Sequence, residues 1–293
     1  MILILLLYAL CASTFTICKA VLMFSKPIFY VAIRMLIGGS LLYGYYIATN
    51  RKKLTIDPRD WGLFLQVIIF HIYIIYVLDL WALQYMTSIT SAFIYNLTPF
   101  ISALFSYFWF NEKITGKKAL GLALGAISLI PIFYQCSCSA GALSSYGYFP
   151  YIAMLLAASS GAYGWILLRE LIKNRHYSPI MVNGLGMLGG GAAALFTSWG
   201  FEHWDTVAPV SNLWPFLQLT LLIVITGNIF FYNLYGYLLK RYTATFLAFA
   251  GFTCPLFAAL FGWLFLGESM SLDLAYSGIL VFIGLYLFYQ DEL

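Results

Sequence analysis

The sequence predicts an all-α integral membrane protein, with ten transmembrane helices arranged as two inverted five-helix repeats around a central cavity. Composition, segment length and an internal repeat together predict this fold class. Of the 293 residues, 62% are hydrophobic and 9% are charged, and the mean hydropathy is +0.88. A soluble domain carries about 25% charged residues, so the bilayer must be the main solvent. The short polar remainder excludes a large soluble nucleotide-binding or catalytic module.

Ten apolar segments have the length of about 18 residues or more that a spanning helix needs. Residues 2–23 form the first, with no basic residues ahead of it and no small-residue cleavage site after it, so we expect a retained helix and not a signal peptide. Clusters of Pro, Gly and charge separate the others. These run over residues 27–48, 61–84, 86–110, 116–134, 148–170, 179–199, 213–239, 242–266 and 272–289.

The positions of the basic residues predict the orientation of these helices. Twelve of the 15 Lys and Arg residues fall in alternate loops: Arg51, Lys52, Lys53, Arg59, Lys113, Lys117, Lys118, Arg169, Lys173, Arg175, Lys240 and Arg241. The opposite loops hold Lys26, with Lys19 near it. Cytoplasmic loops attract Lys and Arg, so both termini should be cytoplasmic. We read the net charge of +4 as an orientation signal and not as a nucleic-acid surface. The short loops favour a bacterial inner membrane.

An internal repeat appears when the sequence is shifted by 156 positions. The shift places Pro99 on Pro255 and Glu112 on Glu268. We therefore expect a first repeat over residues 1–134, an outer loop over 135–147 and a second repeat over 148–293. Each repeat holds five helices, an odd number, so the two copies must enter the membrane from opposite sides. Inverted repeats place a substrate site at their interface near the midplane, which favours transport as the function.

The chain resembles the EamA domain of the drug/metabolite transporter superfamily. The matching positions are Ala82, Leu83, Thr87 to Pro99, Glu112, Gly121 and Gly125 in the first copy, and Thr243, Pro255, Glu268, Gly278 and Gly284 in the second. Arg34 also stands where the first EamA unit usually has an arginine. The resemblance implies ten helices around a cavity, worked by exchange or by an ion gradient. Relatives carry amino acids, sugars, nucleotide derivatives and drugs, and S-adenosylmethionine carriers occur among those of intracellular bacteria.

Three ionisable residues lie deepest in the predicted helices, namely Arg34, His71 and Asp79. A charge inside a bilayer costs several kcal/mol unless it faces protein or water, so each is a candidate for substrate binding. Arg34 and Asp79 have similar predicted depths. Either they form a buried ion pair that locks two helices, or Arg34 binds a substrate carboxylate and Asp79 a substrate cation or proton. His71 either relays a proton or binds substrate, or makes a helix contact.

Aromatic residues make up 19% of the chain, and the polar, mid-helix subset predicts a cavity wall. Ring faces stack planar heterocycles and hold cations, whereas packing in the core is the alternative for each residue. The candidates for substrate binding are Tyr95, Asn96, Tyr163, Trp165, Asn228, Tyr232 and Asn233, with Tyr8, Tyr73 and Tyr76 in the same class.

Two pairs related by the repeat are assigned structural roles. Pro99 and Pro255 each remove a helix hydrogen bond, which predicts a kink that acts as a hinge or frames the cavity. Glu112 and Glu268 fall at helix ends, where a carboxylate accepts from free backbone N–H groups.

A secondary transporter of a small polar metabolite is the function that the sequence predicts. The aromatic rings, Arg34 and Asp79 suit the adenine, carboxylate and positive charges of S-adenosylmethionine, which we expect to be exchanged for S-adenosylhomocysteine. The alternative is an exporter of amino acids or drugs. A channel or an intramembrane enzyme is the rival class. The sequence shows neither the nucleophile motifs nor the paired helix aspartates of such enzymes, and we expect no cofactor, no metal and no ATP coupling. The oligomeric state, the coupling ion and the direction of transport stay open.

Overall fold

The computed structural model describes residues 2–49, 56–85, 91, 94–95, 97–110, 115–128, 130, 148–202, 204, 208–254, 256–257, 260–261, 264, 279–280, 283–284 and 286. In this part of the chain the regular elements are helices. Pairing of extended backbone is confined there to one antiparallel bridge, between Ser25 and Val210. The all-helical prediction is confirmed for these residues.

Six of the described helices are long and apolar enough to cross a membrane. They comprise α1 (Ile2–Val21), α2 (Pro27–Thr49), the segment Pro58–Leu83, the segment Phe149–Asn174, α10 (Pro179–Phe201) and the segment Leu213–Leu238. These agree with six of the ten predicted segments to within a few residues. The chain is therefore a multi-pass integral membrane protein.

Three of the six membrane-length segments change helical geometry along their length. Pro58–Leu83 consists of η1 (Pro58–Asp60), α3 (Trp61–Gln66), the π-helical η2 (Val67–Ile74) and α4 (Ile75–Leu83). Phe149–Asn174 consists of α9 (Phe149–Arg169) and the π-helical η3 (Glu170–Asn174). Leu213–Leu238 consists of α11 (Leu213–Ile223), the π-helical η4 (Val224–Phe231) and α12 (Tyr232–Leu238). A π turn rotates all later side chains about the helix axis, so the buried face cannot be read from a 3.6-residue period.

Shorter helices occupy parts of three further predicted segments. These are α6 (Thr98–Phe110), α7 (Gly116–Ser128) and α13 (Ala244–Ala250), the last followed by the 3₁₀ turn η5 (Gly251–Thr253). The predicted loop 135–147 and most of the predicted segment 272–289 lie outside the described residues.

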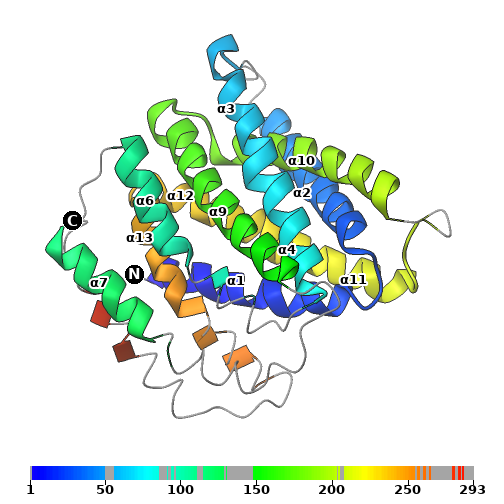
Figure 1. The fold of residues 1–293 in the computed structure, drawn as a ribbon. Coiled ribbons are helices and arrows are strands. Elements are labelled where there is room, and N and C mark those ends of the chain that lie inside the picture. Colours follow the sequence, from blue (N-terminus) through cyan, green and yellow to red (C-terminus); the bar gives the residue numbers. More distant parts are fainter. Residues whose placement is uncertain are drawn as a thin grey trace.

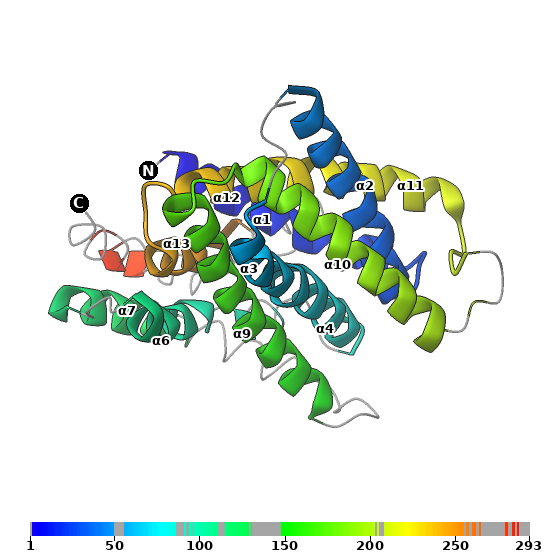
Figure 2. The ribbon, with the colours of Figure 1, turned by 90° about the horizontal axis from the view of Figure 1, so that it is seen from above.

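Helices α2 and α10 lie side by side along much of their length (Figure 1; Figure 2). Glycine makes their close approach possible. A Cβ at Gly39 would lie 2.8 Å from the backbone nitrogen of Leu188, and one at Gly191 would lie 3.0 Å from that of Leu36. Small residues at such crossings let two backbones approach within a membrane, where apolar side chains gain little by leaving lipid.

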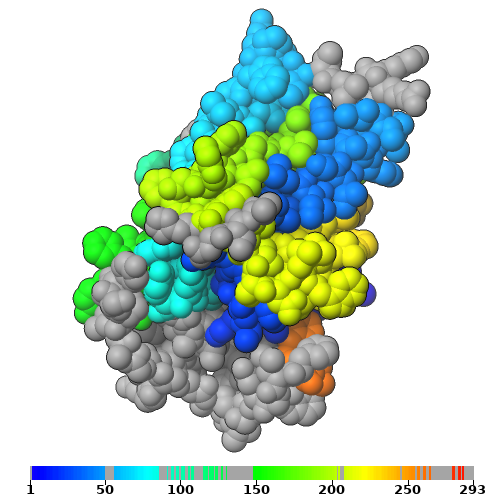
Figure 3. All heavy atoms as spheres, turned by 90° about the vertical axis from the view of Figure 1, so that its right-hand side faces the viewer, coloured from blue at the N-terminus to red at the C-terminus, as the bar shows by residue number. Residues whose placement is uncertain are grey.

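The other described helices pack around this pair. Helix α4 packs on α9, α6 on both α9 and α13, and α1 on α11. Figure 3 looks onto one face of the molecule, where the C-terminal part of α10 lies beside α2. Three of the ionisable residues that the sequence predicts for the site, Arg34, His71 and Asp79, are buried in this interior.

Candidate functional site

Arg34 lies in the middle of the helix packing and is only 3% exposed. Its Nε donates to Oδ1 of Asn228 in η4 at 3.0 Å, and its Nη1 donates to the Cys18 sulfur in α1 at 3.4 Å. The guanidinium carbon lies 4.6 Å from the centre of the Tyr76 ring. Neutral dipoles and a ring face therefore hold this charge. Four membrane-length helices meet at the guanidinium.

Asp79, in α4, presents the opposite charge without direct contact. It is 8% exposed, and its Oδ1 has no hydrogen-bond partner among the described residues. In the same part of the chain no ion pair within 4 Å joins it to Arg34. The locking ion pair that the sequence allowed is thus not formed. A buried carboxylate oxygen without a partner is costly, and a ligand with a positive group would satisfy it.

His71, in η2, is 1% exposed, and neither of its ring nitrogens has a partner among the described residues. Its ring lies edge-on to Trp165, with centroids 4.3 Å apart, and 5.5 Å from Tyr232. Gly164 in α9 leaves room for this ring, because a Cβ there would lie 2.5 Å from Nδ1. His71 therefore belongs to an aromatic cluster and does not contact Arg34.

The aromatic cluster joins α9 to η4 and α12. Trp165 stacks on Tyr235 with centroids 3.6 Å apart and planes 19° from parallel. Tyr232 lies 5.5 Å from Trp165, and its hydroxyl donates to the hydroxyl of Tyr76 at 2.5 Å. This hydrogen bond links the cluster to the ring on which Arg34 lies. A charged region and a stacking region are therefore contiguous.

The remaining predicted site residues make contacts between helices or lie elsewhere. Tyr163 donates to Oε1 of Gln66 at 2.6 Å. The amide of Asn233 donates to the Ile229 carbonyl at 2.7 Å and accepts from Asn183 at 3.4 Å. The ring of Tyr95 meets Phe15 edge-on. Four predicted residues lie outside the described residues, namely Asn96, Glu112, Pro255 and Glu268.

Pro99 lies at the beginning of a helix. Helix α6 begins at Thr98, after a turn at Leu97, so Pro99 is in its first turn. There its missing N–H costs no helix hydrogen bond. The proline therefore marks the beginning of α6, where the sequence predicted a kink within one continuous helix.

Two residues of the site, Cys18 and Tyr235, were not among the predicted set. Cys18 and Tyr235 are apolar or aromatic residues in apolar helices, and their own sequence context carries no signal. Tyr76 and Tyr232, both among the predicted residues, are separated by 156 positions, the spacing of the sequence repeat.

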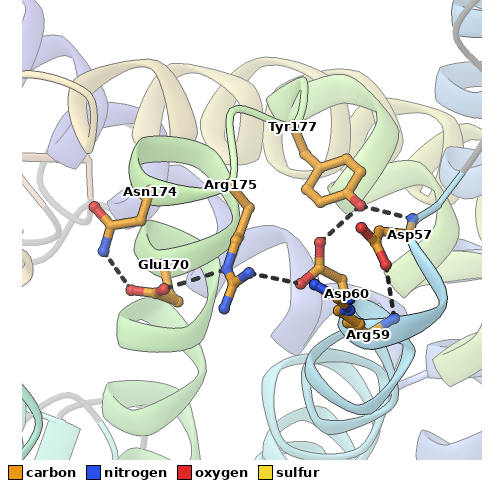
Figure 4. Close-up of polar contacts among 7 residues, drawn as sticks. All are labelled: Asp57, Arg59, Asp60, Glu170, Asn174, Arg175 and Tyr177. Atoms are coloured by element: carbon orange, nitrogen blue, oxygen red, sulfur yellow. Dashed lines mark hydrogen bonds and ion pairs between the residues drawn. The ribbon is translucent and has the colours of Figure 1, made fainter.

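A second polar cluster lies at one end of the bundle, where η1 meets the connection between η3 and α10 (Figure 4). Tyr177 donates to Oδ2 of Asp60 at 2.8 Å and accepts from the backbone N–H of Asp57 at 3.0 Å. Arg175 forms two ion pairs, from Nη1 to Asp60 Oδ1 at 3.5 Å and from Nε to Glu170 Oε1 at 3.7 Å. The side-chain amide of Asn174 also donates to Glu170. Burial, with the hydrogen bond to Asp60, raises the pKa of Tyr177 although the Asp57 N–H lowers it. This network was not predicted, because its members are ordinary loop residues in the sequence.

Comparison with known proteins agrees with this architecture. The EamA-like transporter family matches residues 1–134 and 148–290. A protein of Chlamydia trachomatis serovar L2 named S-adenosylmethionine/S-adenosylhomocysteine transporter is 32% identical over 285 residues, covering 96% of this chain and 86% of that protein. Its namesake in Chlamydia muridarum is 31% identical, covering 96% and 88%. An uncharacterized transporter of Bacillus subtilis is 26% identical, covering 90% and 83%.

A solved crystal structure shares the fold, with a TM-score of 0.77 at 17% identity, covering 99% of this chain and 95% of that one. Two matches to one transporter family span nearly the whole chain, and relatives with over 30% identity cover nearly all of it. The chain is a member of the EamA-like transporter family, a transporter of small metabolites.

Proposed function

We propose that this protein exchanges S-adenosylmethionine for S-adenosylhomocysteine across a bacterial inner membrane, as a secondary transporter working by alternating access. The observation that carries the proposal is the separation of two buried opposite charges. Arg34 and Asp79 lie in the same interior without an ion pair between them, beside a cluster of stacked rings. The names of the chlamydial relatives point to the same substrate pair.

S-adenosylmethionine has one group for each part of the site. Its carboxylate suits the guanidinium of Arg34. Its ammonium and sulfonium suit Asp79 and the ring faces, since cations bind over aromatic rings. Its adenine suits Trp165 and Tyr232, with Asn228 and His71 as hydrogen-bonding neighbours. We assign Tyr95, Asn96, Tyr163 and Asn233 to the surrounding wall, and no chemical step to the protein.

The proposed architecture is ten helices in two inverted repeats, residues 1–134 and 148–293, with both termini cytoplasmic. The two separate family matches support this division. Inverted repeats reach inward-facing and outward-facing states by exchanging the conformations of their two halves. Pro99 and Pro255 are assigned to hinges or to the frame of the cavity, and Glu112 and Glu268 to helix ends.

Counterflow in proteoliposomes tests the proposal. Vesicles loaded with unlabelled S-adenosylhomocysteine should take up external radiolabelled S-adenosylmethionine transiently and saturably. Arg34→Ala and Asp79→Ala should each reduce the rate more than ten-fold while the protein still inserts. Glu170→Gln removes a carboxylate outside the predicted site and serves as the matched control.

The alternatives give different results in the same assay. An amino-acid or drug exporter would show counterflow with those solutes and none with S-adenosylmethionine. A channel would pass solute without saturation and without counterflow. Normal transport by both alanine variants would remove Arg34 and Asp79 from the site.

A further inference from the structure

One hydrogen bond joins two residues that the 156-position shift of the sequence aligns with each other. Tyr76 and Tyr232 are 156 positions apart and their hydroxyls lie 2.5 Å from one another. Atoms related by a two-fold rotation can touch only if both lie close to the axis. In the proposed inverted-repeat architecture, this pair therefore lies at the axis that relates the repeats. When the two repeats exchange conformations, each tyrosine takes the position of the other. The exchange therefore does not require this hydrogen bond to break.

The crossing of α2 and α10 has the same property. The two helices align at a spacing of 152 positions, which pairs Pro27 with Pro179, Met35 with Met187, Leu36 with Leu188, Gly38 with Gly190 and Gly39 with Gly191. Gly39 packs on Leu188, with its Cβ position 2.8 Å from the backbone nitrogen, and Gly191 packs on Leu36 at 3.0 Å. Exchange turns each of these contacts into the other. Both contacts are present together in the conformation that the structure describes.

The loops at the two ends of this helix pair repeat the pattern. At one end Ser25 pairs with Val210, and at the other Tyr177 bonds to Asp57 and Asp60, on either side of Pro58 (Figure 4). Tyr177 lies 152 positions after Ser25, and Val210 lies 152 after Pro58. A gate is closed on one side of the membrane while its counterpart is open on the other. These two ties are counterparts and both are closed, so they do not behave as gates.

The bond between Arg34 and Asn228 lacks such a counterpart. At the spacing of 152, Arg34 corresponds to Gly186, which has no side chain to donate. The exchange cannot reproduce this bond in the other repeat. Contacts around the site charges thus differ between the two sides of the axis, whereas the contacts along the axis do not.

Resting on the proposed transport function, we propose that the Tyr76–Tyr232 bond, the α2–α10 crossing and the two loop ties form an axial core that stays closed in both access states. Alternation then takes place in the helices outside this core. Glu202, directly after α10, reinforces the core by accepting from the backbone N–H groups of Ile28 and Phe29 at 2.8 Å each.

A disulfide across the Ser25–Val210 tie tests the proposal. The backbone N–H of Lys26 donates to the Pro209 carbonyl at 3.2 Å, and that of Ser211 donates to the Phe24 carbonyl at 2.8 Å. Because these two hydrogen bonds flank Ser25 and Val210, the latter form a non-hydrogen-bonded antiparallel pair. The Cα atoms of such a pair are about 4.5 Å apart, within the disulfide range of about 4.4–6.8 Å. The double variant Ser25→Cys/Val210→Cys is reconstituted, oxidised, and assayed for S-adenosylmethionine counterflow before and after reduction, with Ser25→Cys alone as the control.

We expect the oxidised and reduced protein to transport within about two-fold of each other. Loss of counterflow on oxidation, recovered on reduction, would overturn the axial core. So would failure of the Ser25–Val210 disulfide to form.

A second readout separates the core from the substrate. Absence of counterflow in the reduced variant and the wild type counts against the proposed function only. Hydrogen exchange of the Lys26 and Ser211 amides then tests the core without substrate. Equal protection in the oxidised and reduced protein supports it, and exchange more than ten-fold faster after reduction shows that the tie opens.

Discussion

At the scale of single residues, the interior is notable for polar atoms that the fold leaves unsatisfied. Among the described residues, Asp79 Oδ1 and both nitrogens of His71 are buried without a hydrogen-bond partner. An unsatisfied buried polar atom costs about 1–3 kcal/mol, so a structural role alone gives no reason to keep them. In the proposed function, the substrate supplies the missing partners.

Replacing Asp79 by Asn should separate the two proposed substrates. The side chain keeps its shape and loses its charge, and S-adenosylmethionine differs from S-adenosylhomocysteine by a methyl group and a positive charge. The sulfonium has no proton to donate, so its attraction to the carboxylate is Coulombic, about 4 kcal/mol for unit charges about 4 Å apart at an effective dielectric constant of about 20, and affinity for S-adenosylmethionine should fall at least ten-fold. Competition by S-adenosylhomocysteine should change less. An equal loss of affinity for both ligands would show that Asp79 does not distinguish the sulfonium charge.

Gly164→Ala tests the packing of His71. The added Cβ would lie 2.5 Å from Nδ1 and 2.7 Å from the His71 Cα. Overpacking of this kind costs about 1–3 kcal/mol, so the thermal midpoint in detergent should fall by several degrees. Gly44→Ala is the matched control, because no atom lies within 4 Å of its Cβ position and alanine favours the helix. Equal midpoints for the two variants would contradict the packing.

At the scale of elements, the π-helical stretches η2 and η4 place the site. Each lies in a membrane-length segment, and they carry His71 and Asn228 respectively. A wide turn frees backbone carbonyls, and Ser160 Oγ satisfies that of Phe70 at 2.7 Å. Such turns often occur at functional sites. Helix α2 is held at its beginning by Glu202, whose carboxylate also accepts from Ser198 at 2.6 Å.

Glu202→Gln should loosen the beginning of α2. The amide keeps one acceptor oxygen and loses the charge that favours a helix N-terminus, an effect of about 0.3–1 kcal/mol with further loss from the second hydrogen bond. Thermal unfolding should show a midpoint lower by a few degrees. Glu170→Gln, which weakens surface pairs worth about 0–1 kcal/mol, should shift it less. A larger decrease in the midpoint for Glu170→Gln than for Glu202→Gln would contradict the proposed stabilisation of α2 by Glu202.

At the scale of the whole molecule, the proposed inverted topology has a direct consequence for accessibility. The loop between η3 and α10 and the loop before α11 should lie on opposite sides of the membrane. Cysteine at exposed Lys173, next to this loop at the end of η3, should then react with an impermeant maleimide only in inside-out vesicles. Cysteine at exposed Ser211 should react in intact spheroplasts. Labelling of both on one side would overturn the topology, and wild-type protein treated identically corrects for native thiols.

The six described long helices follow closely from the sequence, because burying an apolar stretch of that length in lipid leaves the backbone no alternative to helix. Pro27 and Pro179 even fix where α2 and α10 begin. The candidate site follows in part. Arg34, Asp79 and His71 are identified by the cost of placing polar groups in lipid. Their partners are not, since Cys18 and Tyr235 become neighbours only through packing between distant helices.

The sequence by itself determined that this chain spans a membrane, which residues carry charge into it, and which family it resembles, because these depend on hydrophobicity and local spacing. Only the tertiary structure decided that Arg34 bonds to Asn228 and not to Asp79, that Trp165 stacks on Tyr235, and that Tyr76 meets Tyr232. These contacts depend on helix rotation after a π turn and on glycine-mediated approach. Both are set by packing in three dimensions and leave no periodic signal in one.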